Sequence, residues 1–70
     1  MVEVFKTNVQ SQYDAIALKE ILLKEFPVIQ INFDLDDCDK ILRMEGKIVP
    51  VSSVIQIVKM EGFNCEILEE

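Results

Sequence analysis

The chain contains no histidine and no tryptophan, and only two cysteines, two glycines and two prolines occur among its 70 residues. Histidine is the commonest general base and the commonest imidazole metal ligand, so its absence excludes most catalytic triads and zinc sites. The cysteines, Cys38 and Cys65, lie far apart in sequence and form no CxxC motif. This usage is too sparse for a disulfide-rich secreted domain, so we expect two reduced thiols.

Basic residues are also scarce, because 7 Lys and Arg face 13 Asp and Glu for a net charge of -6. An acid excess of this size repels phosphate groups, so we expect neither nucleic acid nor a membrane surface as a partner. No apolar run approaches the roughly 18 residues of a membrane span. The N-terminal residues lack the layout of a signal peptide, which predicts a cytoplasmic protein.

Half of the residues are apolar, so the chain can fold around a core despite its length. A domain this short buries only about 60% of the surface of its unfolded chain, which leaves no room for a deep substrate cleft. The few glycines and prolines fall between hydrophobic runs, so we expect a single domain over residues 1–70. Composition thus favours a binding module over an enzyme. We expect no cofactor, and the sequence leaves the oligomeric state open, with a monomer slightly favoured.

Hydrophobic periodicity changes several times along the chain. Runs with a period of two residues predict strands, runs with the helical period predict helices, and Gly62 supplies a left-handed stop for the second helix. The expected strands are 2–9, 28–36, 40–45 and 63–68, and the expected helices are 11–26 and 51–61. This βαββαβ order predicts an α+β, ferredoxin-like sandwich, with a four-stranded antiparallel sheet and both helices on one face.

The same alternation predicts which side chains fill the space between the sheet and the helices. The expected core consists of Phe5, Val9, Leu18, Ile21, Leu22, Ile31, Phe33, Leu42, Met44, Val54, Ile55, Val58, Cys65 and Ile67. In this fold the loops after the first strand, at the tip of the central hairpin and after the second helix lie at one end of the domain. We therefore expect any functional site at that end.

Two segments of the chain resemble the heavy-metal-associated (HMA) domain family, which includes the small copper chaperones. Segment 5–9 (FKTNV) resembles the strand that leads into the family's metal loop, and segment 54–63 (VIQIVKMEGF) resembles its second helix and the Gly-aromatic exit. With the loops between them in register, the resemblance covers essentially the whole chain. It implies the ferredoxin-like fold and descent from a metal-binding domain.

The resemblance breaks down at the metal-binding motif. Family members hold a soft cation between the two thiolates of a CxxC motif at the start of the first helix. When Leu18, Ile21 and Leu22 are matched to the helix of the family, Ser11 and Asp14 occupy the positions of the two cysteines. A hydroxyl and a carboxylate are hard oxygen donors, so the resemblance implies that the thiolate metal site has been lost.

Ser11 and Asp14 also have a structural interpretation, because a serine followed three residues later by an acid is typical of a helix N-cap. The alternative is a hard-cation site, in which Asp14 joins Asp36, Asp37 and Asp39 at the same end of the fold. Ca²⁺ takes six to eight oxygen ligands, and four carboxylates on separate loops meet that requirement poorly. The sequence leaves both interpretations open.

Four further residues complete the candidate list. Cys65 is expected to face inward as a small hydrophobe, whereas Cys38 is expected at the exposed hairpin tip, where it can bind a cation together with a partner's cysteine. Tyr13 and Phe63 are aromatic candidates for partner binding, close to where family members dock their partners. The sequence therefore predicts a non-enzymatic, HMA-like interaction module that binds another protein, and the alternative is a metal carrier or sensor.

Overall fold

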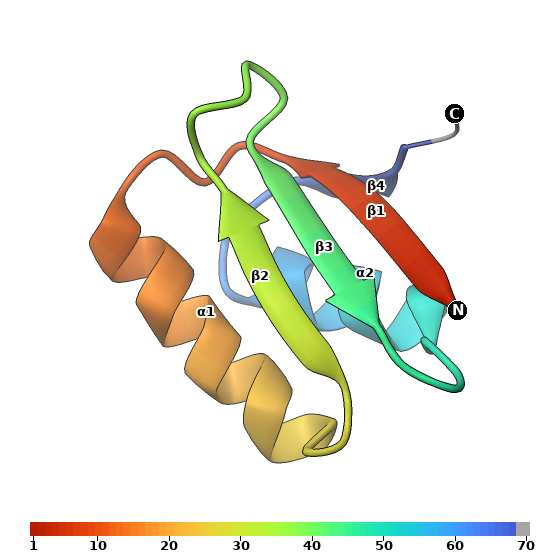
Figure 1. Cartoon of the computed structure of the whole chain (residues 1–70). Helices are drawn as coiled ribbons and strands as arrows, with labels where there is room; N and C mark the ends of the chain where they lie inside the picture. Colours follow the sequence, from red (N-terminus) through yellow and green to blue (C-terminus); the bar gives the residue numbers. More distant parts are fainter. Residues whose placement is uncertain (69–70) are drawn as a thin grey trace.

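A computed structural model describes residues 1–68 of the chain. Strands and helices occupy most of this length and leave short connections between them (Figure 1). In chain order the elements are β1 (Val2–Thr7), α1 (Gln12–Glu25), β2 (Gln30–Asp34), β3 (Ile41–Glu45), α2 (Val51–Met60) and β4 (Cys65–Ile67). Neither α1 nor α2, the helices of the described part, is long and apolar enough to cross a membrane.

The four strands form one sheet in the order β2-β3-β1-β4, and each neighbouring pair is antiparallel. Both helices cover the same face of this sheet (Figure 1). Their buried side chains form a single core with every second residue of the strands, which point to that face. The α+β class and the antiparallel sheet are therefore confirmed, and the arrangement is consistent with a ferredoxin-like fold. Strands β2 and β4 form the two edges.

The core follows the alternation of the strands and the helical period of α1 and α2. Phe5 of β1 and Leu42 and Met44 of β3 are completely buried, and so are Leu22 and Val58 of the two helices. These side chains pack into one cluster. The remaining buried apolar residues are Val9, Ala15, Leu18, Ile29, Ile31, Val49, Val54 and Cys65.

Four residues of the expected core lie less deep than predicted. Ile21, Phe33 and Ile55 are partly buried, and Ile67 is 38% exposed. Ile67 lies on a three-residue edge strand, and within residues 1–68 no strand pairs with the outer side of β4. Ile29 and Val49 are buried in their place, at the end of the sheet opposite to the hairpin tip. There Gly46 lies against Ile29, because a Cβ at this glycine would approach Ile29 Cγ1 to 3.3 Å.

The end of α2 confirms the predicted role of Gly62, whose φ is +94°. The Gly62 amide donates to the carbonyl of Lys59 at 3.0 Å, and the Phe63 amide donates to the carbonyl of Val58 at 3.3 Å. This pair of bonds is the Schellman motif, which often includes an apolar contact from the residue after the glycine. Phe63 packs against the core accordingly.

Candidate functional site

Three connections meet at one end of the domain, as the sequence predicted. They are residues 8–11 after β1, residues 35–40 at the hairpin tip and residues 61–64 after α2, and we call them together the loop end. Thr7 joins the first two, because its amide donates to the carbonyls of Asp39 and Lys40, both at 3.2 Å. The Asn64 amide donates to Asn8 Oδ1 at 2.8 Å and ties the third connection to the first.

The hydroxyl of Thr7 adds two further bonds in a buried position, where the residue is only 6% exposed. It donates to the Lys40 carbonyl at 2.6 Å and accepts from the Val9 amide at 3.2 Å. The strand expected over 2–9 therefore ends at Thr7, since the backbone of residues 8 and 9 turns to bond this side chain. Polar groups buried in this way are costly when they lose their partners.

Lys40 adopts a backbone conformation that is unusual for a residue with a side chain, with a φ of +49°. Its amide donates to the carbonyl of Asp37 at 3.0 Å, which closes the turn at the hairpin tip. Its ammonium group donates to the carbonyl of Leu35 at 2.9 Å. These bonds, with those from Thr7, hold a conformation that costs about 1 kcal/mol or more in an isolated L-residue.

Ser11 and Asp14 behave as helix-capping residues. Ser11 is the N-cap of α1, and its hydroxyl accepts a hydrogen bond from the Tyr13 amide at 3.1 Å. Asp14 lies in the first turn, where a carboxylate complements the positive end of the helix dipole. Within residues 1–68, Asp14 belongs to no group of three or more Cys, Asp and Glu side chains that could hold a metal ion. The N-cap interpretation of the sequence thus accounts for both residues.

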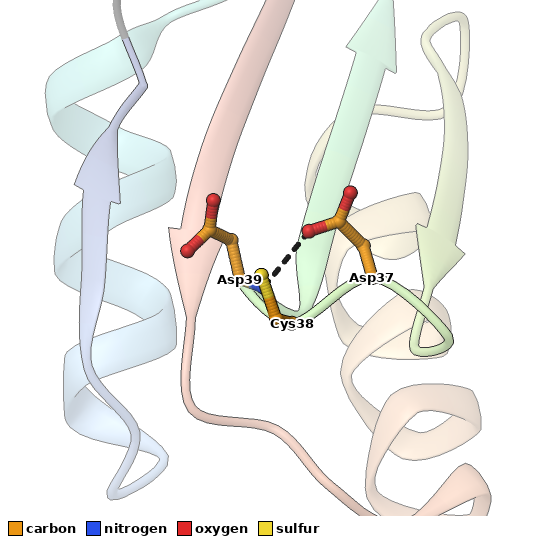
Figure 2. A group of neighbouring side chains, drawn as sticks. All are labelled: Asp37, Cys38 and Asp39. Carbon is orange, nitrogen blue, oxygen red and sulfur yellow. Dashed lines mark hydrogen bonds between the residues drawn. The ribbon is translucent and has the colours of Figure 1, made fainter.

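The predicted carboxylate cluster is assembled only in part. Asp37, Cys38 and Asp39 place one ligand atom each within 4.8 Å of one another, and Figure 2 shows the two carboxylates on either side of the sulfur. Asp14 and Asp36, the other members of the alternative four-carboxylate site, are not part of this group. The reason is local: the hairpin tip curls over three consecutive residues, and Asp14 is held in the first turn of α1.

Hydrogen bonding within the turn explains the arrangement of this group. Asp37 Oδ1 accepts from the Asp39 amide at 2.8 Å (Figure 2). Asp39 Oδ1 lies 3.8 Å from the ammonium nitrogen of Lys6, an ion pair between half-exposed side chains. Two of the three ligand atoms on this turn are oxygens, which is about a third or less of the six to eight that Ca²⁺ prefers, and the third is a sulfur.

The two thiols have opposite environments, as predicted. Both cysteines are free, Cys38 being exposed and Cys65 buried. Burial raises the pKa of the Cys65 thiol from its usual 9.0 to about 11. Because the thiolate is the reactive and metal-binding form, Cys65 is inert at neutral pH and Cys38 is the accessible thiol.

The two aromatic candidates also differ in their surroundings. Tyr13 is 86% exposed in the first turn of α1, whereas Phe63 is partly buried against the core. One turn after Tyr13, Ile16 is 58% exposed. Tyr13 and Ile16 therefore present an aromatic and an aliphatic side chain on neighbouring positions of one helix face.

Sequence reasoning missed two apolar surfaces, because each combines residues from separate elements. One is a hollow of about 310 Å³ between α1 and β2, where Ala15, Ile16, Phe33 and Leu35 are its apolar lining. The other lies at the opposite end, where Val28 is 90% and Ile48 74% exposed. The alternation of residues 29–35 indicated which side chains of this segment share an apolar face. It does not reveal which helix lies beside the strand, so the hollow between α1 and β2 could not be predicted from it.

Comparison of the chain with models of protein families, with curated proteins and with solved structures found no match.

The Thr7 hydroxyl should be the main polar determinant of the loop end. We expect Thr7→Val to lower the free energy of unfolding by about 1–3 kcal/mol, because it leaves the buried Val9 amide without its acceptor. Urea denaturation measures this loss, and faster amide exchange at residues 9 and 37–40 locates it. Thr7→Ser keeps the hydroxyl and should cost less. Equal losses for the two variants would show that packing of the methyl group matters more than the hydrogen bonds.

The raised pKa of Cys65 gives the stability a pH dependence. Above pH 9.0 the unfolded thiol ionises, whereas the folded one stays protonated until about pH 11. The stabilisation is thus complete below pH 9 and is lost as the pH rises towards 11, by at most about 1.4 kcal/mol per pH unit. Urea midpoints of wild type and Cys65→Ala, measured from pH 7 to 10.5, test this difference. Parallel pH profiles for the two proteins would contradict it.

Proposed function

We propose that this chain is a non-enzymatic, cytoplasmic domain of the heavy-metal-associated type that has lost its thiolate metal site and acts as a protein-interaction module. The observation that carries the proposal is the start of α1. Where the resemblance places the metal-binding motif, the chain has a serine that caps the helix and a tyrosine that is 86% exposed.

The arrangement of the elements supports the ferredoxin-like βαββαβ assignment. The chain order alternates β1, α1, β2 with β3, α2, β4, and the sheet order β2-β3-β1-β4 brings the first strand of each half to its centre. Two such halves, with both helices on one face, are the arrangement expected for this fold. The loop end is then the place where the resemblance locates metal binding.

The chemistry of the loop end supports the loss of the metal site. Cu(I) prefers soft sulfur ligands, and the motif positions offer a hydroxyl and a carboxylate. The hydroxyl of Ser11 already accepts the Tyr13 amide, so a ligand would compete with the helix cap. The two thiols of the chain are separated by burial, because Cys65 belongs to the core.

The exposed side chains of α1 support a docking role. Tyrosine is enriched among the residues that contribute most to binding at protein interfaces, because it combines a large apolar ring with a polar tip. In Tyr13 this ring has no packing role in the domain, given its 86% exposure. Together with Ile16, it forms the docking surface that we propose for a partner protein.

A second candidate function is a metal carrier that uses Cys38 with a partner's cysteine. The proximity of Asp37, Cys38 and Asp39 ligand atoms, all within 4.8 Å, favours it. Such a site requires a thiolate from the partner, because Cys38 is the accessible thiol of this chain. Metal binding that disappears in Cys38→Ser and persists in Asp14→Asn would establish this function.

Site-specific photo-crosslinking tests the interaction module. A benzophenone amino acid in place of Tyr13 should crosslink one protein in the cells of origin, and the same group in place of Met60 should not. Met60 is the matched control, because it is 76% exposed on the other helix. The captured protein, purified, should bind wild type and lose about tenfold or more in affinity for Tyr13→Ala, as expected for an aromatic anchor. Equal crosslinking at both positions would refute the proposed docking surface.

Restoring the two cysteines tests the lost metal site. Ser11→Cys with Asp14→Cys should bind one Cu(I) tightly under reducing conditions, because two thiolates then meet at the start of α1. The variant should also lose about 1 kcal/mol of stability with the helix cap. Competition with a Cu(I) chelator measures the affinity, and Ser11→Cys alone is the control. Tight Cu(I) binding by wild type that survives Cys38→Ser would contradict the loss of the site.

A further inference from the structure

Helix α1 lies beside edge strand β2 (Figure 1), and a groove runs between their side chains. Two hollows form it, of about 310 Å³ near the loop end and about 350 Å³ towards the other end, and both are lined by Lys19. We call this feature the β2 groove. It is lined by Gln12, Ala15, Ile16, Lys19 and Leu23 of α1 and by residues 29–36.

The outer edge of β2 is available to another strand. Residues 30–34 pair with β3 without a bulge, and within residues 1–68 their backbone makes no hydrogen bond outside this ladder. In an edge strand every second residue directs its amide and carbonyl groups outward. Natural edges are usually protected by charged side chains, proline or a bulge. Strand β2 has no lysine, proline or bulge, and its one charged residue, Asp34, lies at its end. The other edge strand, β4, has only three residues.

The chemistry of the groove changes along its length. Its lining is apolar where Ile16, Phe33 and Leu35 meet, and Ile16 is 58% exposed there. Asp34 and Asp36, both exposed, lie at the end of the groove next to the hairpin tip. Within residues 1–68, the lining holds one cation, Lys19, against these two carboxylates, so the charge at this end is acidic in excess. A ligand that fits the groove therefore has apolar side chains along its length and a positive charge at this acidic end.

We propose that the β2 groove binds an extended segment of a partner protein, which adds to β2 as a fifth, antiparallel strand. Alternate apolar side chains of the segment enter the groove, and a basic residue at its N-terminal end pairs with Asp34 and Asp36. Strand addition of this kind derives affinity from backbone hydrogen bonds and specificity from alternate side chains. The inference rests on the proposed function and specifies the form of the partner.

The antiparallel direction follows from the sheet. All strand pairs of the domain are antiparallel, and antiparallel pairing is slightly more stable per residue than parallel pairing. An antiparallel segment begins where β2 ends. Its N-terminal residue then lies beside Asp34 and Asp36, which places the basic side chain there.

A second copy of this chain is the competing occupant, and charge argues against it. A β2–β2 pair would align residues 27–36 of the two copies, and this segment contains two aspartates and no lysine or arginine. The strand of the second copy would then bring no counter-charge to the acidic end of the groove, and each copy carries a net charge of -6. Charge complementarity thus favours a partner with a basic residue.

A designed peptide tests the proposal. The probe is an end-capped heptapeptide that begins with arginine and continues with alternating valine and threonine. We expect amide shifts in NMR spectra at residues 30–34 and at Ile16, Lys19 and Leu23, with residues 65–67 of the other edge unchanged. A peptide with proline at the central valine should bind at least about tenfold more weakly, because it lacks a strand amide.

Variants of the groove provide the controls. Ile16→Glu should weaken peptide binding about tenfold or more, because it places a charge in the apolar lining, while Met60→Glu should leave it unchanged. Asp36→Lys should weaken binding of the arginine peptide and strengthen binding of a peptide that begins with glutamate. This exchange keeps the outcome interpretable if Ile16→Glu does not fold.

The possible outcomes separate the inference from the proposed function. Absent binding, shifts at β4, or equal affinity for the two peptides in Asp36→Lys would overturn strand addition, even if crosslinking at Tyr13 identifies a partner. Concentration-dependent dimers with contacts between two β2 strands would identify a second copy as the occupant and also overturn it. If the peptide still binds to Tyr13→Ala and the benzophenone at position 13 crosslinks no protein, the proposal for the β2 groove stands and the Tyr13 docking surface is refuted.

Discussion

The hydrogen bonds of Thr7 are the constraint on which the loop end depends. Its amide and hydroxyl together engage Asp39, Lys40 and Val9, and the hydroxyl spans 33 positions of sequence to reach Lys40. Through these bonds the central strand fixes the hairpin tip and redirects the chain towards Ser11. The left-handed φ of Lys40 is maintained by the same bonds. The amide and hydroxyl of Thr7 therefore hold the hairpin tip against β1, while the bonds within the turn arrange Asp37, Cys38 and Asp39.

Local patterns predicted most of the fold, because the alternation of strands and the period of helices can be recognised within short stretches of sequence. Gly62 is the clearest case, since its left-handed conformation depends on the adjacent helix alone. Burial was predicted less well at Ile67, which lies on an edge strand, and at Ile29, which packs against Gly46 from a separate connection. Edge position is set by strand order, a long-range property that no single segment encodes.

The contrast between local and long-range properties also applies to the candidate site. The cap at Ser11 could be predicted because its acceptor and donor are two residues apart. The carboxylate cluster could not, since whether Asp14 meets the hairpin tip depends on the path of the intervening chain. Phe63 shows a further limit: its position beside the loop end was predicted, but its packing against the core follows from the Schellman motif. A residue that lies near a site can thus have a structural role at a helix end.

Ile16 belongs to both surfaces that we propose for partners, because it neighbours Tyr13 on α1 and lines the β2 groove. A partner strand in the groove would pass within reach of the first turn of α1, where Tyr13 and Asp14 lie. The acidic groups at that end would then select the partner segment in two ways. They repel acidic segments, and they favour the segment direction that places a basic residue beside Asp34 and Asp36. In a domain too small for a deep cleft, an open sheet edge beside an exposed helix face would supply recognition by backbone pairing and charge.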